Sequence, residues 1–479
     1  MTFNSWEFLL FYPIVLLLYF VLPAKMRWVM LLIASYFFYM CYQPELVVLI
    51  FATTLISWIS ARLMEKTEKT LLRRLYLAIT LIVSLGVLFF YKYFDFLSTS
   101  IFNLFDRDPI VLNLILPVGI SFYTFQTLSY VIDVYRKDIN TEKNFFFYAL
   151  FVSFFPQLVA GPIERPENLI PQLRKAHKFS SENAIAGGKF MILGFFKKIC
   201  IADMVSGAVN AVYNNPTEAT SLGIIIATVL FAVQIYCDFS GYTDIAIGCA
   251  RIMGIRLMKN FDHPYTAKTV KEFWARWHIS LSSWFKDYLY IPLGGNRCSK
   301  GRHLFNLFVV FLISGLWHGA AWTFVLWGAL HGIYQIVGTL TIKKRNALVE
   351  RLGFSVDSKP VRIVRMIITF ILVSASWLFF RANSISDAKI LITRLFTASA
   401  PVSLTLSSMG IDLIGALLVI VSIATLIITD RLISYEGTND GSFLITKNGS
   451  FIYFVWIILL SWTVLLSKDM ISTFIYFQF

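Results

Sequence analysis

Length, composition and charge narrow the classes of protein to which this chain can belong. It has 479 residues, of which 57% are hydrophobic and only 15% are charged, and its mean hydropathy is +0.68. A soluble domain carries about a quarter charged residues, so this composition excludes a soluble multidomain enzyme and indicates a helical protein that crosses a membrane several times. The net charge of +14 is typical of cytoplasmic loops beside anionic lipids and does not require a nucleic-acid partner.

Apolar segments recur along the whole chain, and a helix needs about 20 such residues to cross the hydrocarbon layer. Because Met1–Glu7 lacks the basic start of a signal peptide, we expect the first apolar run to be a retained helix. Several runs are short, which indicates tilted, broken or re-entrant helices, and we expect about 11 true crossings. The candidate segments are Phe8–Leu22, Val29–Cys41, Leu46–Ile59, Leu75–Tyr91, Val111–Val131, Phe145–Val159, Ala184–Ile201, Leu222–Ile252, Leu304–Leu316, Trp322–Leu340, Ile363–Phe380, Ile411–Ile428 and Phe451–Leu466.

The positions of Lys and Arg predict the orientation of these helices, because cytoplasmic loops are enriched in both residues. Lys25–Arg27, Arg62–Arg74 and Arg136–Lys143 are basic, and two apolar segments separate each of these loops from the next. The segment Lys343–Arg351 is also basic. We therefore expect all four on the cytoplasmic side and both termini on the extracytoplasmic side.

The middle of the chain departs from this simple alternation of helices and loops. Gly161–Lys178 contains prolines and charges, and Arg251–Arg302 contains ten basic and three acidic residues interspersed with aromatic ones. Polar, irregular backbone at membrane depth occurs only where it is buried in protein or faces water. The middle third is therefore where we expect the functional site.

His318 lies in the sequence SGLWHGAAW, between two apolar runs that are flanked by Arg302 and Lys343. These runs should form a hairpin that enters from the cytoplasm and returns, with His318 near its turn. Gly315 and Gly319 bracket the histidine and permit close backbone approach or a helix break. An ionisable residue inside a membrane is a functional candidate, although a structural histidine bonded to a carbonyl remains an alternative.

His278 lies in the sequence VKEFWARWHISLSSWFKDYLY. Trp274, Trp277, Leu281 and Trp284 recur at intervals of three or four residues, which predicts one amphipathic helix with His278 in its apolar stripe. An interfacial helix with a structural histidine explains the same spacing. Any pairing between His278 and His318, 40 residues apart, must be tertiary.

Acidic residues are scarce in this region. Asp238 and Asp244 are six residues apart, a spacing that aligns them poorly on a helix, and either can orient a histidine or bind a basic residue. The five cysteines show no metal-ligand spacing, so we expect no metal site. The chain also lacks a Walker A loop and the HExxH and GxSxG motifs, which removes the usual signs of ATP-driven transport, zinc proteolysis and serine hydrolysis.

Four ordered segments resemble the membrane-bound O-acyltransferase (MBOAT) family, and most closely its bacterial alginate O-acetyltransferase branch. They are FFPQLVAGPIERPENLIPQL (Phe154–Leu173), QIYCDFSGYTDIAIGCARIMGIRLMKNFDHPY (Gln234–Tyr265), FWARWHISLSSWFKDYLYIPLGGNR (Phe273–Arg297) and SGLWHGAAWTFVLWGALHG (Ser314–Gly332). The resemblance implies a single all-α membrane domain over residues 1–479, with tilted, re-entrant and amphipathic helices around a central tunnel. Its motif-rich core would be 117–332, with peripheral helices at 1–110 and 360–479.

The resemblance also implies a reaction and its residues. His318 falls on the family's catalytic histidine and His278 on its second active-site histidine. We expect five further residues to contact the donor or substrate, namely Arg276, Trp277, Ser282, Asp238 and Trp317. The implied activity is transfer of an acyl group, most simply acetyl, across the membrane to an extracytoplasmic polysaccharide, with His318 as general base.

The implied partners follow from this reaction. No tightly bound cofactor is expected, and the donor would be acetyl-CoA or an acyl carrier protein thioester on the cytoplasmic side of a bacterial cytoplasmic membrane. An exported SGNH-type acetyltransferase would complete the transfer to the glycan. Two alternatives remain open: D-alanyl transfer to teichoic acid from a carrier protein, and a non-enzymatic transporter in which the histidines relay protons.

Overall fold

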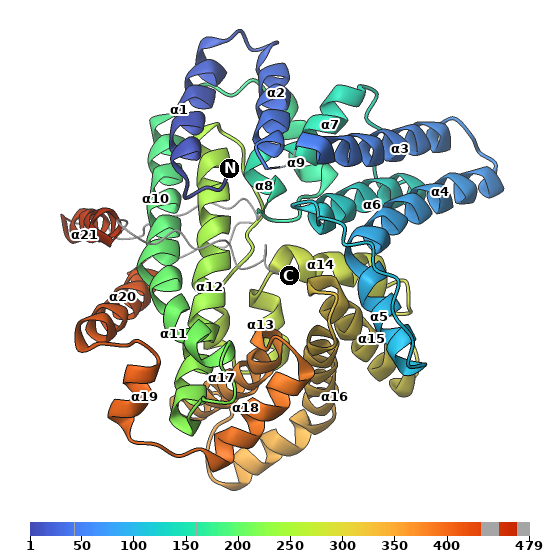
Figure 1. The fold of residues 1–479 in the computed structure, drawn as a ribbon. Helices are drawn as coiled ribbons and strands as arrows, with labels where there is room; N and C mark the ends of the chain where they lie inside the picture. Colours follow the sequence, from blue (N-terminus) through green and yellow to red (C-terminus); the bar gives the residue numbers. More distant parts are fainter. Residues whose placement is uncertain (43, 160, 433–449, 467–479) are drawn as a thin grey trace. The chain divides into compact units, whose positions relative to one another are not determined.

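The computed structural model describes residues 1–42, 44–159, 161–432 and 450–466, and this part of the chain is helical with no β-strand (Figure 1). It divides into two compact units. Unit 1 contains Met1–Gly194 and Tyr242–Met258, and unit 2 contains Phe195–Gly241 together with the described residues from Lys259 onward. The helices α10 (Ser181–Lys197) and α12 (Ser221–Ile252) contribute residues to both units. The expectation of a single domain stays a prediction.

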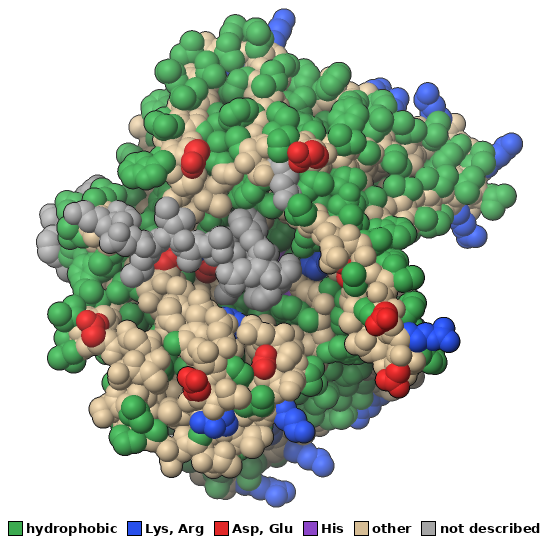
Figure 2. Space-filling view, viewed as in Figure 1, with side chains coloured by type: hydrophobic (Ala, Val, Ile, Leu, Met, Phe, Trp, Pro, Cys, Tyr) green, Lys and Arg blue, Asp and Glu red, His purple; other side chains and the backbone are tan. Residues whose placement is uncertain are grey.

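Unit 1 is built mainly from the N-terminal helices, in which α3 packs against α4 and α6, and α2 against α7. Figure 2 shows hydrophobic side chains over the visible face of α1 to α4, with Lys and Arg at the outer ends of these helices, as expected for helices that face lipid. Besides its share of α10 and α12, unit 1 contains α1 (Trp6–Val21), α2 (Arg27–Met40), α3 (Val47–Glu65), α4 (Thr70–Leu88), α5 (Phe94–Leu104), α6 (Ile120–Arg136), α7 (Phe145–Ser153), α8 (Phe155–Leu158) and α9 (Pro166–Arg174).

Unit 2 contains the segments in which the sequence predicted the site. The helices α15 and α16 form its main hairpin, and α17 packs along α16. Besides its share of α10 and α12, it contains the π-helical turn η3 (Lys198–Asp203), α11 (Met204–Tyr213), α13 (Val270–Arg276), α14 (Ile279–Phe285), η5 (Lys286–Tyr290), α15 (Lys300–His318), α16 (Trp322–Arg351), α17 (Lys359–Arg381), α18 (Ile385–Thr397), α19 (Val402–Ser408), α20 (Leu413–Leu432) and α21 (Ser450–Leu466).

Five described helical segments are long and apolar enough to cross a membrane, and α19 with α20, bent by 82°, form a sixth if they are one broken span. The five are Pro44–Glu65, Thr70–Leu104, Ser221–Ile252, Trp322–Arg351 and Lys359–Arg381. Shorter apolar helices, including α1 and α2, lie between them. The chain is therefore a multi-pass membrane protein, while the total of about 11 crossings stays a prediction.

Two of the predicted membrane segments are wrong in their bounds. Val111–Val131 was expected to be one helix, but α6 begins only at Ile120, after Gly119 in the left-handed region at φ +72°. The carboxylate of Asp95 accepts hydrogen bonds from the backbone N–H groups of Leu112 (2.7 Å) and Asn113 (3.0 Å). These bonds give partners to two N–H donors in a segment that is not helical. Likewise, Phe145–Val159 is broken at Phe154 into α7 and α8.

Candidate active site

The hairpin of α15 and α16 positions His318 as the last residue of α15, and α16 starts at Trp322. This confirms the predicted turn. The two helices meet at backbone contact: a Cβ atom on Gly315 would meet the carbonyl oxygen of Phe324 and lie 3.0 Å from the Cα atom of Gly328. Small residues allow such close helix packing. The hairpin thereby holds the end of α15, and the histidine on it, in a defined position.

The His318 side chain is buried among aromatic rings. Only 3% of the residue is exposed. Its ring centroid lies 4.9 Å from Trp317, 5.0 Å from Trp327 and 5.5 Å from Phe380. The described surroundings of the His318 ring are therefore aromatic and largely apolar.

His278 lies in a break between two short helices, so the single amphipathic helix predicted for this segment is wrong. The first helix, α13, is capped by Thr269 and ends at Arg276, and α14 begins at Ile279. His278 is the N-cap of α14 and adopts the left-handed conformation at φ +43°. Non-glycine residues rarely adopt it, and such strained positions cluster at functional sites. The predicted burial of His278 is confirmed, because the residue is 0% exposed.

Asn260 holds the start of α14 and the ring of His278 together. Its backbone carbonyl accepts from the Ile279 N–H (2.9 Å), and its Oδ1 atom accepts from the Ser280 N–H (3.2 Å) and the Ser280 hydroxyl (2.9 Å). The Nδ1 atom of His278 lies 3.1 Å from the same Oδ1. The backbone N–H of Ser280 can only donate, so the atom facing it is the amide oxygen, which can only accept.

This geometry sets the tautomer of His278. Because Oδ1 of Asn260 is an acceptor, Nδ1 of His278 carries the proton, and in a neutral ring the lone pair then lies on Nε2. Burial lowers the pKa of His278 to about 3, so the ring is neutral in the physiological range. His278 therefore presents a hydrogen-bond acceptor at Nε2.

Trp317 contacts both histidines. Its ring centroid lies 5.9 Å from that of His278 and 4.9 Å from that of His318. The next layer is also aromatic, since Trp277 lies 5.3 Å from Trp377, and Trp377 lies 5.6 Å from Trp327. The structure thus brings the two predicted histidines to one shared indole.

A third histidine, His331, lies in the same aromatic cluster and was not singled out from the sequence. The indole N–H of Trp274 donates to its Nδ1 atom at 3.1 Å, so its proton is on Nε2, which lies 2.9 Å from the Ser376 hydroxyl. Ser376 in turn donates to the carbonyl of Val373 at 2.7 Å. Both ring nitrogens are satisfied, which identifies His331 as a structural residue joining α13, α16 and α17.

Asp238 binds a basic residue, which was one of its two predicted roles. The Nζ atom of Lys198 lies 2.7 Å from Asp238 and 2.8 Å from Asp203, and all three side chains are buried. The π-helical turn η3 brings Lys198 and Asp203, five residues apart, into this contact. The cluster ties η3 to α12 on the side of the unit that carries Phe239, whose ring lies 4.7 Å from His278.

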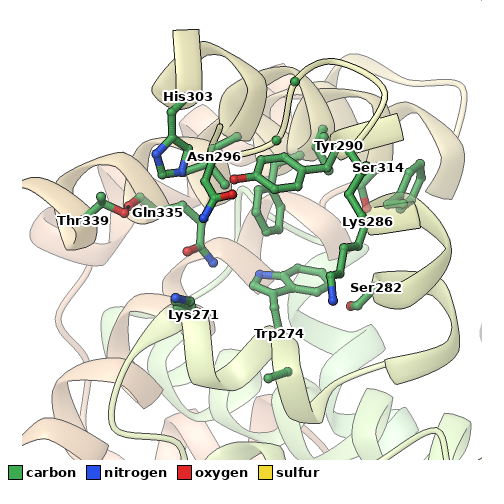
Figure 3. A pocket seen from close by; sticks show the side chains of 18 of the residues that line it. Lys271, Trp274, Ser282, Lys286, Tyr290, Asn296, His303, Ser314, Gln335 and Thr339 are labelled. Carbon is green, nitrogen blue, oxygen red and sulfur yellow. Dashed lines mark hydrogen bonds between the residues drawn. The ribbon is translucent and has the colours of Figure 1, made fainter. Parts of the chain in front are cut away.

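A cavity of about 960 Å³ is lined by residues of α13, α14, η5, α15 and α16 (Figure 3). His278 and His318 do not line it, but Ser314, one turn before His318, and Ser282, one turn after His278, do. Lys271, Lys286 and Arg297 line it without an ion-pair partner among the described residues, and no acidic side chain lines it. The remaining wall is largely apolar, with Trp274, Leu281, Phe285, Leu307, Val310 and Phe311.

The other residues expected to contact the donor or substrate are distributed differently. Ser282 lines the cavity and donates to the Trp277 carbonyl at 3.3 Å. Arg276 instead pairs with Glu272 at 2.6 Å and donates to Thr266 at 2.8 Å, outside this cavity. Trp277 is fully buried and stacks on Phe273 with centroids 5.4 Å apart. Of the five, only Ser282 lines the cavity, and only Trp317 contacts both histidines.

The charge density of the sequence predicted the cations of the cavity, but no sequence feature predicted the role of Asn260. The cationic block Arg251–Arg302 contains Lys271, Lys286 and Arg297, so the cavity cations lie where charge density pointed. Asn260 is an ordinary polar residue 18 positions before His278, and nothing in the spacing indicates that it is the hydrogen-bond partner of the His278 ring. Its contact arises only from the tertiary fold.

Comparisons with known proteins place this site within a family. The sequence model of the membrane-bound O-acyltransferase family matches residues 136–380. A protein named "Probable alginate O-acetylase" from Pseudomonas aeruginosa is 39% identical over 81% of this chain and 73% of its own length. A "Peptidoglycan O-acetyltransferase" from Helicobacter pylori is 36% identical over 79% and 76%. A "Teichoic acid D-alanyltransferase" from Streptococcus thermophilus is 26% identical over 55% and 68%.

This chain belongs to the membrane-bound O-acyltransferase family. It is an O-acyltransferase, and the resemblance based on the four sequence segments is confirmed. Membership also excludes the alternative of a non-enzymatic transporter. Both histidines, Trp317, Asn260 and the cavity lie inside the matched range.

Proposed function

We propose that His318 is the general base of an acyl transfer from a thioester to a hydroxyl group, and that His278 positions the reacting hydroxyl. The observation that carries this proposal is the pair of buried histidines on one indole, with a cation-lined cavity that includes a serine one helical turn from each. A neutral imidazole can act as a general base.

The proposed step balances its atoms and protons. The hydroxyl oxygen attacks the thioester carbonyl carbon while His318 takes the hydroxyl proton. The carbon–sulfur bond of the tetrahedral intermediate then breaks, and His318 returns the proton to the departing thiolate. The products are an ester and a free thiol, and the histidine is regenerated without a net change.

The tautomer of His278 favours one of the two roles open to it. An Nε2 lone pair accepts a hydrogen bond but cannot donate one to an oxyanion. Because the single proton of the attacking hydroxyl goes to His318, we assign His278 to orienting the acceptor molecule through a neighbouring hydrogen-bond donor. Stabilisation of the oxyanion then falls to donors other than the neutral His278 ring.

The cavity supports a phosphate-bearing thioester as the donor. Lys271, Lys286 and Arg297 offer three positive charges, and the apolar wall suits the uncharged arm of such a donor. Acetyl-CoA and the phosphopantetheine arm of an acyl carrier protein both have this chemistry. By the predicted orientation, the cavity opens on the cytoplasmic side, where thioesters are made.

The names of the relatives guide the choice of acyl group and acceptor. The proteins named for acetylation of alginate and peptidoglycan match more of this chain, and at higher identity, than the one named for D-alanylation. We therefore propose acetyl transfer to an extracytoplasmic polysaccharide across a bacterial cytoplasmic membrane, completed by an exported SGNH-type acetyltransferase. D-Alanyl transfer from a carrier protein is the second candidate.

The identity of the acyl group can be tested in cells that carry or lack the gene for this protein. Cell-surface polysaccharide from the two strains is released and analysed by mass spectrometry for ester-linked groups. We expect a mass difference of one acetyl group per modified sugar in the strain that carries the gene, and no such ester in the other. Ester-linked D-alanine in place of acetate would establish the second candidate, and identical polysaccharides would contradict both.

Lys286→Gln is expected to weaken donor binding rather than the chemical step. Removing one exposed cation from the cavity should raise the KM for a coenzyme A thioester about three- to tenfold with kcat nearly unchanged. The measurement is steady-state thiol release by the protein in vesicles. Lys300→Gln is the matched control, because this exposed lysine belongs to the same basic block but does not line the cavity. Equal effects of the two variants would show that only the general surface charge matters.

A further inference from the structure

A second groove in unit 2 lies between α16 and α17, beside the start of α13, and it shares Lys271, Gln335 and Thr339 with the larger cavity. Figure 1 labels these three helices. Its volume is about 640 Å³. The groove is lined by Lys268–Lys271, by residues of α16 from Ile333 to Arg345 and by residues of α17 from Arg365 to Leu372. Both α16 and α17 belong to helical segments long and apolar enough to cross a membrane.

Four cations line this groove, and no acidic side chain does. They are Lys268, Lys271, Arg345 and Arg365. None of the four forms an ion pair within the described part of the chain, although Arg365 is held in place by a hydrogen bond to Asn346 at 2.8 Å. The groove therefore carries uncompensated positive charge.

The nearest acidic residue in the sequence does not neutralise these cations. The carboxylate of Glu272 accepts from the Arg276 guanidinium at 2.6 Å and from the Lys268 backbone N–H at 2.8 Å. Arg276 is not part of the groove. The charge of Glu272 is thus already satisfied by a cation outside the groove.

Two of the four cations lie on α16 and α17 near the loop that joins these helices. Arg345 lies six residues before the last residue of α16, and Arg365 lies six residues after the first residue of α17. At a rise of 1.5 Å per residue, the backbones of both lie roughly 9 Å from the joining loop. In a bilayer, this is about the depth at which headgroups meet the hydrocarbon layer. The guanidinium of Arg345 reaches back along α16 and donates to the Gly338 carbonyl at 3.4 Å.

Exposed aliphatic side chains line the groove together with these cations. Ile333 and Val337 of α16, and Ile368 of α17, are 45%, 50% and 50% exposed, and Leu372 lies one turn beyond Ile368. Along their helices, Ile333, Val337 and Leu372 lie more than one turn further from the joining loop than the arginines at 345 and 365 do. Ile368 lies less than one turn further. Gly338 leaves the floor open, because a Cβ atom there would meet no heavy atom within 4 Å.

We propose that this groove binds an anionic glycerophospholipid, with its phosphate held by cations of the groove and an acyl chain against the exposed aliphatic side chains. Basic pockets between membrane-spanning helices on the cytoplasmic side are suited to anionic headgroups. The groove offers both cations and exposed aliphatic side chains, which match the two parts of such a lipid. A free anion would use the cations but leave the aliphatic side chains uncovered.

The probe is phosphatidylglycerol, compared with phosphatidylcholine, and the readout is the lipid retained by the purified full-length protein in native mass spectrometry. The double variant Lys268→Gln/Arg345→Gln removes two groove cations and should reduce retention of phosphatidylglycerol about 30-fold, at one factor of about five per basic residue. Lys343→Gln/Lys344→Gln is the matched control, because both lysines are exposed, adjoin Arg345 in sequence and lie outside the groove. This control should retain the lipid.

A second variant fills the open space beside Gly338 without changing the charge of the groove. Gly338→Leu projects into the open floor and is expected to reduce lipid retention while leaving the thermal unfolding temperature unchanged or raised, because leucine favours helix more than glycine does. Its readout stays informative even if the charge variant fails to fold.

Three results would overturn the proposal. Equal loss in the two double variants would reduce the effect to general surface charge. Displacement of phosphatidylglycerol by excess inorganic phosphate would identify a free-anion site, and equal retention of phosphatidylcholine would show that the headgroup charge is irrelevant. None of these measurements depends on acyl transfer, and Lys271, which also lines the larger cavity, is left unchanged.

Discussion

His318→Gln is expected to lower the rate of acyl transfer by about 10²- to 10⁴-fold, the range typical for loss of a positioned general base. Glutamine has a similar size and can still form hydrogen bonds, but it cannot take a proton at neutral pH. The aromatic shell of Trp317, Trp327 and Phe380 also provides no substitute base. The measurement is transfer of labelled acyl groups by protein reconstituted in vesicles, corrected for the amount of folded protein.

The control for this experiment is another histidine with no place in the site. His263→Asn suits that purpose, because His263 is partly exposed, binds Asp262 and occupies a left-handed position that asparagine tolerates well. We expect His263→Asn to keep most of the activity. If His318→Gln kept the rate of the unsubstituted protein at normal abundance, His318 would not be the base.

Asn260→Asp is expected to give the protein a new dependence on pH. Aspartate keeps the oxygen that accepts from Nδ1 of His278, but its charge lies beside a ring that is otherwise neutral. An adjacent carboxylate raises the pKa of a histidine, so the imidazolium of His278 becomes populated as the pH falls. The protonated ring has no Nε2 lone pair, so activity should be lost on the acid side and recovered as the pH rises.

The comparison with Asn260→Ala separates positioning from a purely structural role. Alanine removes the acceptor for His278 and for both donors of Ser280, so activity should fall about tenfold or more at every pH. A structural role alone would lower the amount of folded protein in both variants without moving the pH profile. Parallel profiles for Asn260→Asp and the unsubstituted protein would therefore refute the positioning role of Asn260.

Local sequence patterns predicted the parts of the fold that depend on local physics. The long apolar runs became α12, α15, α16 and α17, and flanking charges with two glycines predicted the turn at His318. The period of aromatic residues around His278 correctly predicted burial but not the break, because one left-handed residue leaves the spacing of its neighbours unchanged.

The remaining parts of the site depend on contacts between residues distant in sequence. Trp274 meets His331 across 57 residues, and Lys198 meets Asp238 across 40. Neither pairing leaves a periodic trace in the sequence. The pairing of the Asp95 carboxylate with the backbone N–H groups of Leu112 and Asn113 likewise leaves no periodic trace. Such residues are recognised only once the fold brings their partners together.

The backbone contact between Gly315 and Gly328 limits which part of the cavity wall can change. This matters for the size of the acyl group that the site can accept. A larger residue at either glycine would meet a carbonyl oxygen or a Cα atom of the facing helix, so the α15–α16 wall cannot be reshaped without displacing His318. The side chains of Leu281 and Phe285 on the short helix α14 also line the cavity. Selectivity for acyl length can therefore change through α14 while the position of the base is preserved.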